Sequence, residues 1–297
     1  MQISKFKIFF INLKSREENW ISAHRVFSAL PNGVANHLER IEAVDTRKGL
    51  APLEELGLTL DPVGISYQLY FSQSAGASGC YASHYSAWKK IVDEDLDYGI
   101  ILEDDVVVSD VINFLFSQPP MEPGVELLHL GKRGFAGLEA YLFSKSGAQK
   151  AISLTHNHEP LSNIVPRTGT EGEHLEAFIQ KHPDFDWSEK DTISAPVDRF
   201  LMHACHKTID DEHRIKVQFL PCIDLTVCGG EQSDIYGGKM SQITPYYNMD
   251  EDQLEKFTQS KKFKSWEQDT QSTLCICTYN NYRLLYKQAK KFNVRNL

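Results

Sequence analysis

Short apolar segments typical of buried strands alternate with segments of helical periodicity in the first half of this chain. The strand-like segments cover 6–13, 38–44 and 98–102, and the helix-like ones follow Ser15 and cover 79–92. Two strands that are joined through a helix usually lie parallel to each other in the same sheet. The pattern predicts an α/β fold with a mostly parallel central sheet flanked by helices, and Ser15 as the N-cap of the first helix.

The second half of the chain continues this pattern and then interrupts it. A long polar segment at 155–195, rich in His, Pro, Gly and Glu, separates two core-like parts. We interpret this segment as an insertion or a mobile lid. The elements around it are strand-like at 125–130, 140–143 and 215–219, helix-like at 146–154 and core-like at 196–205.

The composition excludes several classes of protein. Of 297 residues 41% are hydrophobic and 24% are charged, as in soluble globular domains. No apolar run reaches the ~18 residues of a membrane span, and the first apolar segment is too short for a secretion signal, so we expect a cytoplasmic protein. A net charge of −9 argues against a nucleic-acid partner.

The charge is distributed unevenly along the chain. Between Glu255 and Leu297 there are nine basic and three acidic residues, and the rest of the chain is strongly acidic. Phe257, Phe263 and Trp266 are interleaved with the lysines of this basic tail. Such a segment suits docking on an anionic inner-membrane surface, a helical contact in a homodimer, or a solvated helix on the acidic body.

Three consecutive acids follow the strand-like segment 98–102. Strand alternation places Glu103 and Asp105 on one side and Asp104 on the other. Ligands bind at the carboxyl ends of strands in open α/β sheets, and two carboxylates there can hold Mg²⁺ or Mn²⁺. The alternative interpretation is a solvated acidic turn.

Seven short motifs run through residues 6–236. They are Ile11-Asn12-Leu13 with Arg16, 41–45 ending in Asp45, Gly79-Cys80-Tyr81-Ala82-Ser83-His84 with Trp88, 101–105, Ala140-Tyr141-Leu142 with Ser144, Gly147 and Ala148, Pro196-Val197-Asp198 with Leu201, and Ser233-Asp234-Ile235. In this order and spacing they resemble glycosyltransferase family 25, the lipooligosaccharide-biosynthesis galactosyltransferases that also include the collagen galactosyltransferases.

The resemblance implies a GT-A-like glycosyltransferase domain over 1–250 that binds a UDP-hexose donor and a divalent metal, Mn²⁺ or Mg²⁺. The implied reaction is inverting transfer of a hexose, most often galactose from UDP-galactose, onto a lipooligosaccharide or lipopolysaccharide core. The enzyme would then be a β-galactosyltransferase, and docking through the basic tail would make it peripheral on the inner membrane. Two segments lie outside the resemblance. We predict that 155–195 is an insertion or acceptor lid and that 251–297 is a basic C-terminal extension.

Inverting transfer is a single displacement, so one carboxylate must deprotonate the acceptor hydroxyl while a metal stabilises the departing diphosphate. We assign Glu103 and Asp105 as the metal ligands. The candidate bases are Asp198, Asp234 and Glu139, in that order. The alternatives are a helix N-cap for Asp198 and a polar loop for Asp234.

The remaining site predictions concern the nucleotide-sugar. Arg16 could pair with a phosphate bidentately, and Asp45 could accept hydrogen bonds from uracil or ribose. His84 could bind the nucleotide or orient a carboxylate, and the alternative is a buried histidine satisfied by the backbone. Cys80 is predicted to pack rather than react. The full set of predicted donor contacts is Asn12, Arg16, Asp45, Ser83, His84 and Asp104.

Other functions fit parts of the pattern. The same fold could use UDP-glucose or a UDP-N-acetylhexosamine, since galactose and glucose differ only in the orientation of one hydroxyl. A catalytically silent saccharide-binding or assembly protein would not need the intact pair Glu103 and Asp105. A metal-dependent phosphohydrolase would also place carboxylates at a strand end, but would need more Asp and His ligands in close spacing.

Overall fold

The structure is a computed structural model. It describes residues 5–59, 76–104, 106–108, 121, 123–130, 138–157, 159–161, 196–219 and 226–228. Asp105, Asp234, most of 155–195 and all of 251–297 lie outside these residues. The division into a domain over 1–250 and an extension over 251–297 therefore stays a prediction.

Six strands form the central sheet in the order β2-β1-β3-β6-β5-β7. Three of its five pairings are parallel, and β6 runs antiparallel to both of its neighbours. The strands are β1 (Phe6–Asn12), β2 (Leu38–Glu42), β3 (Tyr98–Glu103), β5 (Leu127–His129), β6 (Ala140–Ser144) and β7 (Val217–Phe219), and a separate pair joins β4 (Val106–Val108) to β8 (Thr226–Cys228).

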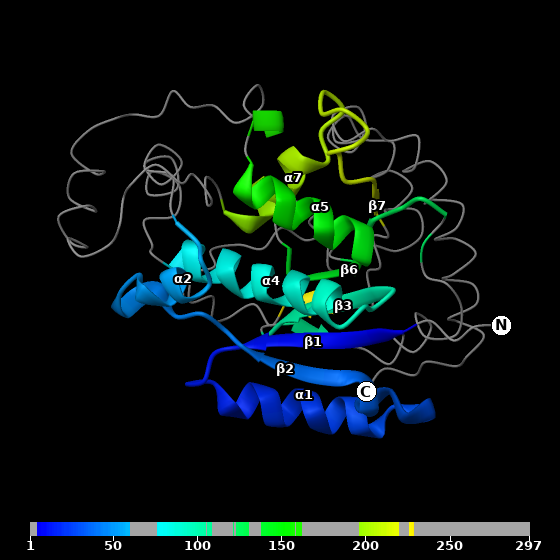
Figure 1. Ribbon diagram of the computed structural model, residues 1–297. Helices are drawn as coiled ribbons and strands as arrows, with labels where there is room; N and C mark the ends of the chain where they lie inside the picture. The colour runs from blue at the N-terminus through cyan, green and yellow to red at the C-terminus, as the bar shows by residue number, and fades with distance from the viewer. Residues whose placement is uncertain are drawn as a thin grey trace, which may run out of the picture.

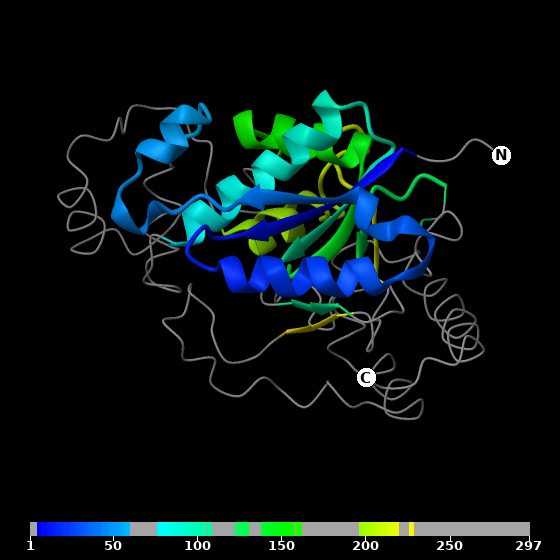
Figure 2. The same ribbon diagram turned by 90° about the horizontal axis from the view of Figure 1, so that it is seen from below.

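Helices cover both faces of this sheet (Figure 1). On one face lie α4 (Gly76–Asp93), α5 (Lys145–His156) and α7 (Val197–Ala204), and on the other lie α1 (Glu17–Ala29) and η1 (Pro31–His37). Figure 2 shows α1 from below, in front of the strands. The predicted α/β class with a mostly parallel, helix-flanked sheet is confirmed. The remaining short helices are η2 (Thr46–Lys48), α2 (Ala51–Glu55) and η5 (Glu159–Leu161).

Alternate residues of the strands fill two hydrophobic clusters on opposite sides of the sheet. In β1, Phe9 and Ile11 pack with the residues of α4, whereas Ile8 and Phe10 pack with Phe27 of α1. Each large apolar side chain buried in this way contributes roughly 1.5–3 kcal/mol. The same alternation in β3 directs side chains at odd-numbered positions toward α4 and those at even-numbered positions toward α1.

The first turns of α4 dock closely against the chain that leaves β2. A Cβ at Gly79 would lie 2.3 Å from the carbonyl oxygen of Val44, so only glycine permits this approach. The Ser83 hydroxyl accepts from the backbone N–H of Val44 at 2.8 Å and donates to the carbonyl of Gly79 at 2.7 Å. These contacts fix α4 at the carboxyl edge of the sheet.

The prediction that Ser15 caps the first helix is wrong. The N-cap of α1 is Arg16, whose side chain makes no capping hydrogen bond. Its carbonyl oxygen instead accepts from Nδ2 of Asn12 at 2.9 Å and from the backbone N–H of Asn19 at 3.1 Å. A side chain from the end of β1 thus holds the start of the helix, but it donates to a carbonyl and does not accept from the free N–H groups that a cap would satisfy.

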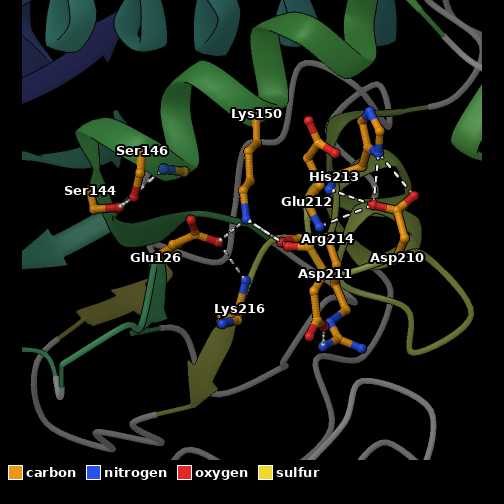
Figure 3. A network of polar contacts seen from close by, with 11 residues as sticks. Glu126, Ser144, Ser146, Lys150, Asp210, Asp211, Glu212, His213, Arg214 and Lys216 are labelled. Carbon is orange, nitrogen blue, oxygen red and sulfur yellow. Dashed lines mark hydrogen bonds and ion pairs between the residues drawn. The ribbon is translucent and has the colours of Figure 1, made fainter.

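A polar network joins α5 to the chain that enters β7 (Figure 3). Nζ of Lys150 donates to Oε2 of Glu126 at 3.1 Å and to the carbonyl of Arg214 at 2.8 Å. The backbone N–H of Lys216 donates to the same Glu126 oxygen at 3.0 Å. Because Glu126 is buried, Lys150 supplies the charge that compensates its carboxylate.

Replacing Lys150 with methionine should lower the free energy of unfolding by about 2 kcal/mol, because a buried carboxylate loses its cation. Lys145 lies on the same helix and pairs with Asp95, whose side chain is 70% exposed. Lys145→Met should therefore cost less than about 1 kcal/mol. Urea unfolding of both variants measures the difference, and equal losses would contradict the role given to Lys150.

Candidate active site

The carboxyl ends of β1 and β3 meet at one edge of the sheet. The two strands are parallel neighbours, with Ile11 paired to Glu103. The chain that leaves β1 at Asn12 therefore passes the chain that leaves β3 at Asp104. Ligands bind at this edge in open α/β sheets.

Asp104 is held on the α1 side of this edge. Its Oδ2 accepts from Nδ2 of Asn12 at 2.7 Å and its Oδ1 from Nη1 of Arg16 at 3.0 Å. Nδ2 of Asn19, which the sequence analysis missed, donates to the Asp104 carbonyl at 3.1 Å. Burial raises the pKa of the Asp104 carboxyl, while the charge of Arg16 and the hydrogen bond from Asn12 oppose this shift. Three predicted donor contacts thus come together as partners of one another.

The side-chain oxygen of Asn12 is a buried acceptor without a hydrogen bond among the described residues. Its side chain is fully buried, and Nδ2 donates to both Arg16 and Asp104. Turning the amide over would set its oxygen against two acceptors, so the orientation is determined. Oδ1 has no hydrogen-bond partner in the part of the chain that the structure describes. A buried acceptor of this kind can receive a donor group from a ligand.

Glu103 faces the opposite side and meets α4. Its Oε1 lies 3.0 Å from Nε2 of His84 and 3.7 Å from Sγ of Cys80. The other ring nitrogen of His84 lies 2.9 Å from the Tyr141 hydroxyl, which accepts from Nε1 of Trp88 at 2.8 Å. His84, Tyr141 and Trp88 are all fully buried. The prediction that Glu103 and Asp104 point to different sides agrees with these contacts.

Glu103 has the properties of a ligand for a hard cation. Its side chain is 26% exposed, and among the described residues no hydrogen bond reaches its Oε2. Carboxylate oxygens are the ligands that Mg²⁺ and Mn²⁺ prefer. Cys80, His84 and Glu103 also have donor atoms within 4.8 Å of one another, a second arrangement that could hold a metal. The second predicted ligand, Asp105, lies outside the described residues.

Residues 6–122 match the family model described as "Glycosyltransferase family 25 (LPS biosynthesis protein)". The resemblance to family 25 is confirmed. The matched segment includes Asn12, Arg16, the helix α4 and the whole acidic run 103–105. The groups around Asp104 and Glu103 thus lie in this segment, apart from Tyr141 of β6.

Curated relatives of family 25 resemble the chain over a larger part of its length. A "Glycosyltransferase 25 family member" of Drosophila melanogaster is 26% identical over 215 residues, 63% of this chain and 33% of its own. Human "Procollagen galactosyltransferase 2" is 23% identical over 236 residues, 68% of this chain and 35% of its own. The rat "Probable inactive glycosyltransferase 25 family member 3" is 28% identical over 48% of this chain and 28% of its own.

The chain spans about a third of the length of these curated relatives. Among solved structures, apo mouse xyloside xylosyltransferase 1 aligns with 73% of this chain and 86% of that chain. The identity is 12% and the TM-score 0.32, which is too low to establish a common fold.

Two other predicted donor contacts are already engaged within the protein. Asp45 accepts from the backbone N–H of Arg47, and its two oxygens lie 2.7 and 2.8 Å from the guanidinium nitrogens of the same residue. Ser83 is buried and uses its hydroxyl as donor and acceptor between α4 and Val44. The structure gives both residues a local structural role, and their contact with a nucleotide stays a prediction.

The structure describes two of the three candidate bases. The carbonyl of Glu139 accepts from the backbone N–H of Glu103 at 2.9 Å, and the Glu139 side chain is buried. Asp198 lies in the first turn of α7, where Pro196 is the N-cap, so Asp198 is not the cap. Asp234 lies outside the described residues. The assignment of the base stays a prediction.

A further group of ligand-type side chains, Asp210, Glu212 and His213, lies away from this edge (Figure 3). Oδ1 of Asp210 accepts from the backbone N–H groups of Glu212 and His213, both at 3.0 Å. Nδ1 of His213 lies 2.8 Å from the same oxygen. These bonds close a turn, so the group has a structural explanation without a metal.

Proposed function

We propose that this chain is a glycosyltransferase that transfers galactose from UDP-galactose to a saccharide acceptor of the lipooligosaccharide or lipopolysaccharide core. The main support is that the segment similar to family 25 contains the acidic run and the helix that contacts Glu103. The family description names lipopolysaccharide biosynthesis, and the human relative is named a galactosyltransferase.

The proposed reaction is an inverting displacement. The acceptor oxygen attacks the anomeric carbon as the bond from that carbon to the diphosphate breaks, and Asp198, Asp234 or Glu139 takes the hydroxyl proton. A divalent cation at Glu103 and Asp105 would supply charge stabilisation for the diphosphate. Asn12 Oδ1 offers a buried acceptor for a donor group of the nucleotide. Arg16, at the start of α1, forms an ion pair with Asp104 within the protein.

The test is binding and hydrolysis of a panel of UDP-sugars, with and without Mn²⁺, by the wild type and Asp105→Asn. We expect Mn²⁺-dependent turnover of UDP-galactose that Asp105→Asn loses. Asp93→Asn is the control, since this acid of α4 is 64% exposed and pairs with Lys89. Turnover of UDP-glucose or a UDP-N-acetylhexosamine instead would correct the donor, and no binding of any UDP-sugar would refute the proposal.

A second candidate function is a catalytically silent saccharide-binding protein. The name of the rat relative, which contains the word "inactive", favours this alternative. Such a protein would bind an oligosaccharide acceptor but show no turnover of any donor at any metal concentration. The two functions therefore give opposite results in the same assay.

The membrane contact is a separate proposal that rests on the basic tail. Among the described helices, none is both long and apolar enough to cross a membrane. The full chain should co-sediment with anionic phospholipid vesicles, and a version ending near residue 250 should not, because the nine basic residues of the tail lie beyond that point. Binding that survives the truncation would contradict the proposal, and a change in oligomeric state on truncation would favour the homodimer.

A further inference from the structure

We propose that Trp88, Tyr141 and His84 are positioning residues that hold Glu103 ready for a divalent cation, an inference that rests on the proposed function. We call these three residues, together with Glu103, the buried polar network. Its members come from α4, β6 and β3, and successive polar atoms lie 2.8, 2.9 and 3.0 Å apart. The network ends on Oε1 of Glu103 and leaves Oε2 for the cation.

The direction of each hydrogen bond follows from the chemistry of the four groups. The indole N–H of Trp88 can only donate, so it donates to the Tyr141 oxygen. Burial raises the pKa of Tyr141 well above its ordinary value, so the hydroxyl keeps its proton. Among the described residues, the acceptor for that proton is Nδ1 of His84. His84 therefore carries its own proton on Nε2 and donates it to Glu103.

The buried polar network is anchored in the hydrophobic core. The rings of His84 and Tyr141 are stacked, with centroids 5.6 Å apart and planes at 17°. Trp88 packs against Phe143 and Phe200. A donor held this rigidly fixes the rotation of the Glu103 carboxylate. Oriented histidines and hydrogen-bonded carboxylates have this function around metal sites in general.

The same geometry argues against direct metal binding by Cys80 and His84. A cation bound to Nε2 of His84 would require the imidazole proton to move to Nδ1. The Tyr141 hydroxyl would then lose its acceptor and remain buried with an unsatisfied proton. The described contacts thus favour a cation on Oε2 of Glu103, without Cys80 and His84 as ligands.

The experiment measures Mn²⁺ affinity of the full chain without donor, by electron paramagnetic resonance of the free ion. Tyr141→Phe removes the hydroxyl and keeps the ring, and should weaken Mn²⁺ binding roughly tenfold. Tyr81→Phe is the matched control, because Tyr81 is equally buried and its hydroxyl lies 2.8 Å from Oγ1 of Thr155. It should leave the Mn²⁺ affinity unchanged.

A second pair of variants changes His84. His84→Gln retains an N–H donor that can reach Glu103, and should bind Mn²⁺ more tightly than His84→Leu, which has none. Equal Mn²⁺ affinities in this pair, or equal effects of Tyr141→Phe and Tyr81→Phe, would overturn the positioning role.

Co²⁺ tests the competing arrangement directly. A thiolate-to-cobalt charge-transfer band that disappears in Cys80→Ser and persists in Cys205→Ser would show that Cys80 is a ligand, and would overturn our assignment. Cys205 is the buried control cysteine. A wild type that binds no divalent ion would refute the metal dependence of the proposed function itself. Binding by the wild type with unaffected variants would refute only the network.

Discussion

Replacing Glu103 with glutamine should reduce metal-dependent donor turnover by roughly 10²–10³-fold while the fold remains intact. The amide oxygen of glutamine can accept the hydrogen bond from Nε2 of His84, as Oε1 does now at 3.0 Å. That bond leaves the amide nitrogen in the place of Oε2. An N–H₂ group there cannot bind a cation, so the variant loses the ligand and keeps the network.

The measurement is UDP release at saturating donor, together with Mn²⁺ affinity and thermal unfolding. Asp93→Asn, which changes an exposed acid at the end of α4, should be within about twofold of the wild type because it only loses a surface pair with Lys89. Glu103→Gln with wild-type Mn²⁺ affinity and turnover would remove Glu103 from the metal site.

The location of the acidic run can be predicted from the sequence because it depends on one local pattern. Residues 98–102 form a buried strand, and buried strands of an α/β sheet end where the chain reaches the solvent edge. Glu103 is therefore only partly buried, at the end of β3. Strand alternation, also a local property, assigns Glu103 and Asp104 to opposite sides.

The partners of these acids depend on pairings between distant strands. Asn12 meets Asp104, 92 positions later, only because β1 and β3 are parallel neighbours in a particular register. Tyr141 reaches His84 because β6 lies antiparallel beside β3, with Ile101 paired to Tyr141. No local pattern specifies that neighbour or register.

One signal for the buried polar network was nevertheless present in the sequence. His84 and Trp88 are four residues apart on a predicted helix, so their side chains share one face. A tyrosine between two apolar residues of a predicted strand, as in 140–142, must find a hydrogen-bond partner if it is buried. The two observations together indicate a polar contact beneath α4, although the residues that complete it require the structure.

Replacing Arg16 with methionine should lower the free energy of unfolding by about 3 kcal/mol. The side chains of Arg16 and Asp104 are only 14% and 12% exposed, and they lie 3.0 Å apart. Loss of the cation leaves the Asp104 carboxylate poorly hydrated and next to Glu103. Breaking a buried ion pair from one side is strongly destabilising because the remaining charge has no partner. Arg47→Met is the control, because Arg47 is 41% exposed. This replacement should lower the free energy of unfolding by less than about 1 kcal/mol.

The pH dependence separates a loss of charge from a loss of packing. Burial raises the folded-state pKa of Asp104 above its unfolded value, and removing Arg16 should raise it further. A carboxyl with a raised pKa favours the folded state at low pH and loses that contribution as the pH rises through the folded pKa. The deficit of Arg16→Met relative to the wild type should therefore shrink in acid, where Asp104 is protonated and needs no cation. Urea unfolding from neutral to acidic pH measures this, and a deficit that stays constant would mean that Arg16 stabilises the fold through its packing alone.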